Sequence, residues 1–170
     1  GMNHNLAVRS DGTVFAWGDN YLGKLGDGTT TTRLTPVLVP GAGSIVAVAA
    51  GAYHSVALRG NGSVLAWGQN AHGQVGDATG TDRTTPVAVV GASGVVALAS
   101  GGWHTLALKS DGTILAWGYN GFGDLGDGTS TNRLSAVTIA GARNVVALAA
   151  AKVEHGGLAR GFQLEQCERH

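Results

Sequence analysis

The chain has 170 residues with 11 basic and 11 acidic side chains, and hydrophobic residues make up 44% of it. This neutral, weakly charged composition excludes a disordered chain and lacks the basic footprint of a general nucleic-acid binder. The sequence contains no run of about 18 apolar residues, which a membrane-spanning helix would need. No signal-peptide pattern is visible at its start, which favours a cytoplasmic localisation.

The sequence repeats itself with a period of 50 residues. The copies are residues 1–50, 51–100 and 101–150, and each opens with Gly-x-x-His. Each copy also carries Ala-Trp-Gly and, further on, Gly-Asp at matching places. A period of this length indicates a β-propeller blade rather than a helical solenoid or a leucine-rich repeat.

Four strand signals, A to D, follow one another along the repeat. Val95–Ala99 is a short apolar run with β-branched residues, and Thr105–Lys109 is a second. Asp111-Gly112 makes a tight turn into Thr113–Trp117, which is a hairpin signal. A long glycine-rich loop then leads to Ala136–Ile139. We therefore predict an all-β chain in which each blade is an antiparallel sheet of four strands.

Large and small apolar residues alternate within strands B and C, and both faces of these strands are apolar. This pattern is expected when each sheet packs against a neighbour on both sides. The recurrent tryptophans Trp17, Trp67 and Trp117 are therefore predicted to form the core between sheets, rather than a binding or light-absorbing site.

The repeat G-x-x-H-[NST]-[LV]-A-[VL]-[RK]-x-[DN]-G-[ST]-[VI]-x-A-W-G-x-N-x-x-G-x-[LV]-G-D resembles that of the regulator of chromosome condensation family, including its many bacterial members. The resemblance covers residues 1–150. It implies a β-propeller, which in that family closes with seven blades. It also implies a binding scaffold, since members include a nucleotide-exchange factor for a small GTPase, β-lactamase inhibitors and plant ultraviolet receptors.

Three blades do not close a propeller, which typically needs roughly four to eight. The first copy supplies strands B, C and D without A, and Val145–Ala150 is a spare strand A. We therefore expect a homodimer that closes a six-bladed ring, the alternative being a fragment of a longer propeller. Residues 151–170 are a degenerate repeat start, with a decayed strand B at Ala151–Leu158, and an irregular tail.

The motifs that suggest chemistry have simpler explanations in the repeat. Gly18-x4-Gly23-Lys24 has the glycine spacing of a phosphate-binding loop, but Leu25 stands where Ser or Thr should hold magnesium. No nucleophile, base and orienting group occur in a catalytic arrangement. We therefore predict a chain that is not an enzyme and has no cofactor.

Two sets of polar residues recur at matching places in the three copies. We predict hydrogen-bonded structural histidines and structural carboxylate–guanidinium pairs, the alternatives being a metal site and an anion or calcium clamp. The histidines are His4, His54 and His104, and the pairs are Asp27–Arg33, Asp77–Arg83 and Asp127–Arg133.

Positions that vary between copies are free of the packing constraint and collect aromatic side chains. They lie in the A–B and C–D connections, which emerge on the same face of a blade. We predict that this face binds a protein partner, because exposed aromatics are typical interface anchors. Alternatives are that some pack beneath their own loops, or that the central channel holds a ligand or enzyme site. His72 is expected to be an exposed loop residue. The predicted binding residues are Tyr21, Leu22, Tyr53, His72, Trp103, Tyr119 and Phe122.

Overall fold

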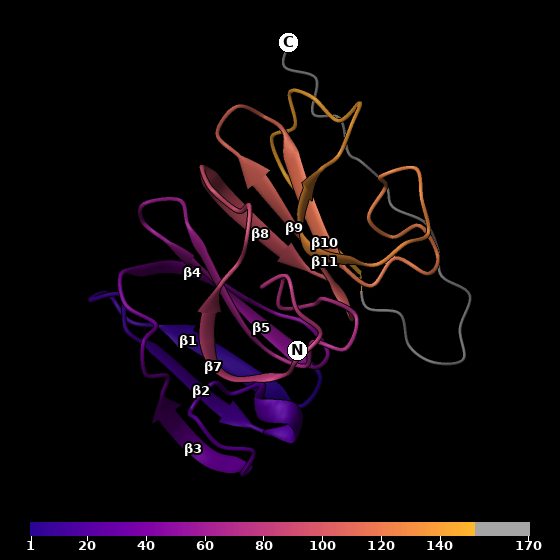
Figure 1. Ribbon diagram of the computed structural model, residues 1–170. Helices are drawn as coiled ribbons and strands as arrows, with labels where there is room; N and C mark the ends of the chain where they lie inside the picture. Colours follow the sequence, from indigo (N-terminus) through magenta and orange to yellow (C-terminus); the bar gives the residue numbers. More distant parts are fainter. Residues whose placement is uncertain (152–170) are drawn as a thin grey trace.

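A computed structural model describes residues 1–151, so the predictions made for residues 152–170 lie outside the described part. Three antiparallel sheets lie side by side, from β1–β3 in indigo and purple to β8–β11 in salmon and orange (Figure 1). None of the described residues forms a helix long and apolar enough to cross a membrane.

The first sheet contains β1 (His4–Val8), β2 (Val14–Gly18) and β3 (Arg33–Leu38), with a short 3₁₀ turn at Tyr21–Gly23. The second contains β4 (Ile45–Ala50), β5 (His54–Arg59), β6 (Val64–Gly68) and β7 (Arg83–Ala88). The third contains β8 (Val95–Ser100), β9 (His104–Lys109), β10 (Ile114–Gly118) and β11 (Arg133–Thr138).

The four strands predicted for the repeat are confirmed as β8, β9, β10 and β11, which pair in that order. Strand D begins three residues earlier than expected, at Arg133. The predicted hairpin turn is held by Asp111, whose Oδ1 accepts hydrogen bonds from the amide and the hydroxyl of Thr113 at 3.0 and 2.6 Å. Gly112 supplies the positive φ of 77° that this turn requires.

The first sheet has three strands, as predicted, but the spare strand expected at Val145–Ala150 is not a strand within the described residues. This segment starts as β4 does. Val145 donates its amide to Gly112 O at 3.2 Å, just as Ile45 donates to Gly12 O at 3.1 Å. The difference is that β4 has β5 beside it. A strand is defined by its ladder of hydrogen bonds, and residues 145–150 have no such partner within residues 1–151.

The tryptophans form the core between sheets, with one exception. Trp67 and Trp117 are fully buried, and their indole N–H groups donate to Lys24 O and Gln74 O, each at 3.0 Å, in the preceding sheet. Trp17 is only half-buried, so the prediction that it lies in the core between sheets was wrong. The physical reason is that no sheet precedes the first one among the described residues.

Glycines make the close approach of the sheets possible. A Cβ on Gly26 would lie 2.6 Å from Nε1 of Trp67, and a Cβ on Gly76 would lie 2.8 Å from Cδ1 of Trp117. Both glycines also have a positive φ, which strains any other residue. The glycine at this repeated position, Gly26 or Gly76, therefore leaves the space that the indole of the next sheet occupies.

Candidate functional site

Each C–D loop is held in shape by a buried asparagine and a carboxylate–guanidinium pair. Arg33 Nε donates to Asp27 Oδ2 at 2.7 Å, and Asn20 Nδ2 donates to Asp27 Oδ1 at 3.1 Å. Asn20 Oδ1 in turn accepts the amide of Leu25 at 2.9 Å. The same contacts recur around Asn70 and Asn120. The predicted structural pairs are therefore confirmed, whereas the asparagine was missed although it recurs with the same period.

The electrostatics of these loops favour an ionised carboxylate. A hydrogen bond from the Thr129 hydroxyl, with further ones from Arg133 and Asn120, lowers the pKa of Asp127 to about 2. Both oxygens of the Asp127 carboxylate accept hydrogen bonds from residues of its own loop. The carboxylate therefore has a structural role, which is to hold the loop in shape.

The C–D and A–B connections bring most of the predicted aromatic residues together in one continuous row. Tyr53 and Trp103 come from the A–B connections, immediately before β5 and β9, and the others come from the C–D loops. Neighbouring ring centroids along the row are 5.2 to 6.4 Å apart. We call this row the aromatic face; in order, it consists of Tyr21, Tyr53, Trp103, His72, Tyr119 and Phe122.

The two ends of the aromatic face are the most exposed. Tyr21 is 60% and Phe122 is 77% exposed, whereas the rings between them are half-buried against one another. Leu22, the seventh predicted residue, is half-buried beside Tyr21, with a φ of 59° in the 3₁₀ turn. The structure therefore brings six of the predicted residues into one row and leaves Leu22 at its margin.

His72 is not the exposed loop residue that the sequence predicted. Its ring stacks on Trp103 at 5.2 Å between centroids and lies edge-on to Tyr119. Nδ1 of His72 is 3.3 Å from the amide nitrogen of Asn132, which belongs to the next repeat. Contacts between repeats, invisible to an inspection of one loop, account for the error.

A buried lysine lies beneath the aromatic face and was not identified as part of it. Lys24 is 1% exposed, and its Nζ donates to Met2 O at 3.0 Å and forms an ion pair with Asp19. The same ammonium lies 5.4 Å from the ring centroid of Tyr53, a cation–π distance. Its engagement in these contacts is consistent with the interpretation that the phosphate-loop spacing is coincidental.

The recurrent histidines link neighbouring sheets. His4 Nε2 is 2.9 Å from Ser55 Oγ, and His54 Nε2 is 3.0 Å from Thr105 Oγ1. Burial lowers the pKa of His54 to about 3, so its ring is neutral at physiological pH. The hydrogen-bonded role predicted for the histidines is thus confirmed for these two. Within residues 1–151, no cluster of three His, Cys, Asp or Glu residues has the arrangement of a metal site.

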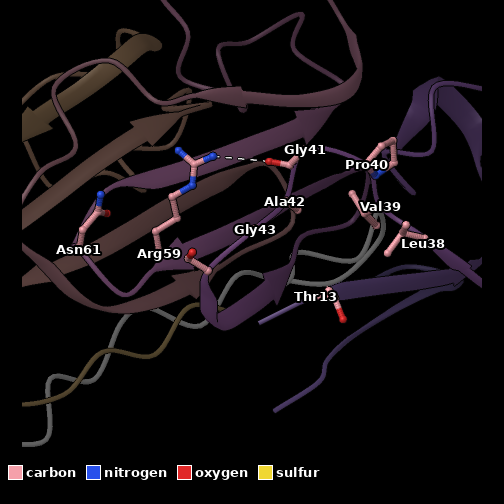
Figure 2. Close-up of a pocket in the computed structure, with 10 residues that line it drawn as sticks. Thr13, Leu38, Val39, Pro40, Gly41, Ala42, Gly43, Arg59 and Asn61 are labelled. Atoms are coloured by element: carbon pink, nitrogen blue, oxygen red, sulfur yellow. Dashed lines mark hydrogen bonds between the residues drawn. The ribbon is translucent and has the colours of Figure 1, made fainter. Parts of the chain in front are cut away.

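An open hollow of about 670 Å³ lies at the opposite end of the sheets, beside the B–C turns (Figure 2). Its lining includes Leu38, Gly41, Arg59 and Asn61. Figure 2 shows Arg59 reaching the carbonyl of Gly41, at 3.5 Å. The lining residues include the hydroxyls of Thr13 and Ser44 but no acid, histidine or cysteine.

Comparison with protein families finds two matching models, both described as the regulator of chromosome condensation (RCC1) repeat. One matches residues 11–58 and 61–108, and the other matches residues 45–74 and 95–124. These matches fall on the repeated strands and on the turns between them.

Among curated proteins, the chain is 48% identical over 54 residues to the E3 ubiquitin-protein ligase HERC2 of Homo sapiens. It is 46% identical over 54 residues to the protein RCC2 homolog of Danio rerio. Each alignment covers 31% of this chain, but only 1% and 11% of the respective relatives. The chain therefore spans a small part of the curated relatives it matches.

Solved structures share the fold at low identity. Human WBSCR16 superposes with a TM-score of 0.77 at 24% identity, over 88% of this chain and 40% of that one. Yeast RCC1 (Prp20), solved with Kap60 bound, gives 0.77 at 24% identity, over 89% and 38%. Prp20p of Saccharomyces cerevisiae, whose binding to Gsp1p and histones was studied with its structure, gives 0.70, also at 24% identity, over 82% and 36%.

Proposed function

The chain belongs to the regulator of chromosome condensation (RCC1) repeat family, and from this premise we propose that it is a non-enzymatic scaffold that binds a protein partner on its aromatic face. The proposed scaffold is residues 1–150, divided into the repeats 1–50, 51–100 and 101–150. The partner is a folded protein or a protein segment.

The observation that carries this proposal is the continuous row of rings across all three sheets. Tyrosine and tryptophan supply large, rigid contact area and are the residue types enriched at the centres of protein interfaces. Exposed rings at both ends of the row, Tyr21 and Phe122, offer apolar surface that water covers in the free chain. An extended row of this kind suits a protein surface better than it suits a small molecule, which prefers an enclosed pocket.

The comparisons support a binding role in a general way. Yeast RCC1 was solved with Kap60 bound, and Prp20p was studied for binding to Gsp1p and histones. Those partners belong to those proteins, and at 24% identity the likeness to this chain is one of fold. They illustrate that the same arrangement of blades serves as a platform for other proteins.

A capture experiment with paired variants tests the proposal. The chain is immobilised and exposed to extract from its source organism, and retained proteins are quantified by mass spectrometry. Tyr21→Ala combined with Phe122→Ala removes the two most exposed rings and should reduce capture by about tenfold or more, as loss of interface anchors does. Leu38→Ala, which truncates a 54% exposed side chain beside the hollow in Figure 2, is the matched control.

The outcome is judged on the difference between the two variants. Circular dichroism and melting temperature should match the unsubstituted chain in both cases, because neither variant touches a buried side chain. Partners retained by the control and lost by the double variant support the aromatic face. Equal retention by both variants, or equal loss from both, contradicts the proposal.

A further inference from the structure

We propose that Asn61 is a site of spontaneous deamidation, which converts one turn of the second sheet into the acidic form that the other two repeats carry. The turn between β5 and β6 reads Asn61-Gly62-Ser63. The matching B–C turns read Asp11-Gly12-Thr13 and Asp111-Gly112-Thr113. The inference is independent of the scaffold function, since it concerns the end of the sheets opposite the aromatic face.

The reaction uses only the Asn-Gly pair, hydroxide and water. The main-chain nitrogen of Gly62 loses its proton to hydroxide and attacks Cγ of Asn61, and the side-chain amide leaves as ammonia with a proton from water. One water molecule then opens the resulting five-membered succinimide at either carbonyl, which gives aspartate or isoaspartate at position 61. The net change replaces an NH₂ group by an OH group, without oxidation or reduction. Gly62 favours the attack because it has no Cβ beside the attacking nitrogen.

The side chain of Asn61 is accessible and lightly held. It is exposed, and its Oδ1 accepts the amide and the hydroxyl of Ser63 at 3.0 and 2.8 Å. The attacking nitrogen, in buried Gly62, donates to Arg59 O at 2.9 Å. The reaction therefore proceeds from a local opening of the turn. That opening breaks these three hydrogen bonds and leaves the paired residues of β5 and β6 in place.

A second Asn-Gly pair in the described residues serves as an internal control. Asn120 precedes Gly121, but its side chain is fully buried. Its Nδ2 donates to Asp127 Oδ1 at 3.0 Å and to the carbonyls of two further loop residues at 3.1 Å each. Freeing this amide requires the whole C–D loop to open, which is a larger and rarer event than opening one turn. Folding should therefore protect Asn120 and leave Asn61 open to reaction.

The aspartate product fits the turn because the other repeats already carry it. Asp111 Oδ1 accepts the amide and the hydroxyl of Thr113, which are the same two bonds that Asn61 forms with Ser63. A carboxylate oxygen accepts both bonds as well as an amide oxygen does. The isoaspartate product does not fit, since its main chain runs through one additional carbon atom.

The new carboxylate also gives Arg59 an ionic partner. Arg59 and Asn61 both line the hollow in Figure 2, where Arg59 reaches Gly41 O at 3.5 Å. Arg59 forms no ion pair within residues 1–151. At the matching places in the third repeat, Lys109 Nζ lies 3.1 Å from Asp111 Oδ2. Deamidation is therefore expected to draw the guanidinium toward position 61 and to neutralise the positive charge that lines the hollow.

Peptide mapping of the aged, folded chain tests the reaction. The purified full chain is kept in mildly alkaline buffer, with circular dichroism confirming that it stays folded, and samples are digested and analysed by liquid chromatography with mass spectrometry. Asn61 should deamidate about tenfold faster than Asn120 or more. In concentrated urea the two sites should react at similar rates, because unfolding removes the protection. An amide at position 61 that survives as long as that of Asn120 in the folded chain overturns the proposal.

A pair of variants tests the consequence for Arg59. Asn61→Asp makes the deamidated product directly and should keep the melting temperature of the unsubstituted chain, while the Nε–H resonance of Arg59 shifts in the NMR spectrum. Asn61→Ser is the matched control, since it keeps a side-chain oxygen but adds no charge, and should leave this resonance near its original position. Equal spectra for the two variants overturn the pairing of Arg59 with the new carboxylate, and a lower melting temperature for Asn61→Asp alone overturns the claim that the turn accepts it.

Discussion

Truncating Trp67 to alanine should lower the free energy of unfolding by about 3–5 kcal/mol. The indole is fully buried between the first and second sheets. An aromatic side chain of this kind buries roughly 150–250 Å², and at about 25 cal/mol per Å² this corresponds to about 4–6 kcal/mol before the site relaxes. The truncation also removes the donor that serves Lys24 O, although the Ser55 hydroxyl still bonds this carbonyl at 2.7 Å.

Urea denaturation followed by far-ultraviolet circular dichroism measures the loss. Trp117→Ala, at the equivalent buried site, should cost a similar amount. Trp67→Phe keeps a ring in this space but lacks the N–H, and should cost less than the alanine variant. A loss below about 1 kcal/mol for Trp67→Ala would mean that the indole contributes little to packing, which would refute the assignment of the tryptophans as the core between sheets.

The remaining predictions concern the histidines, the glycines beside the indoles and the carboxylates that hold the loops. Because burial holds the pKa of His54 at about 3, below its unfolded value of about 6.5, the unfolded chain binds more protons between these values. Stability should therefore be complete above pH 6.5 and fall as the pH drops, and His54→Asn should flatten this slope in urea titrations between about pH 7 and 5. Gly76→Ala should destabilise more than Gly128→Ala in thermal melts, since both have positive φ but only the first would press a Cβ against an indole; equal losses would show that strain alone matters. Asp77→Asn weakens the charged hydrogen bond from Arg83 and should lower the free energy of unfolding by about 1–3 kcal/mol. Amide hydrogen exchange in that loop should become faster, and unchanged exchange would contradict this prediction.

Periodicity made most of the fold predictable, because residues that recur with one period occupy equivalent environments. The strands of the blade, the three-stranded first sheet and the carboxylate–guanidinium pairs were all predicted from local pattern and repetition. The aromatic positions were also brought together as expected, because they lie in the connections at one end of the sheets. Whether they bind a partner stays a prediction.

The errors arise where equivalence between copies breaks down. Trp17 has the sequence context of the other tryptophans, yet it is only half-buried, since burial depends on a neighbouring sheet and not on the local pattern. Residues 145–150 have the sequence of a strand without a partner to pair with in the described residues. His72 was misjudged, and the contacts of Lys24 were missed, because their partners lie in another repeat or far away along the chain, at separations that no local motif reveals.

Each buried indole donates its hydrogen bond to a main-chain carbonyl of the neighbouring sheet's C–D loop. The contact between the sheets therefore does not depend on which side chain the accepting residue carries. Lys24, Gln74 and Asp124 are equivalent residues with positive, neutral and negative side chains. The first two accept an indole N–H through the backbone, while their side chains reach the Tyr53 ring and the His72 amide beneath the aromatic face. Mutation at this one position can therefore change the charge beneath the aromatic face while the main-chain contact between the sheets keeps its geometry, so that a duplicated repeat can vary its surface without losing its packing.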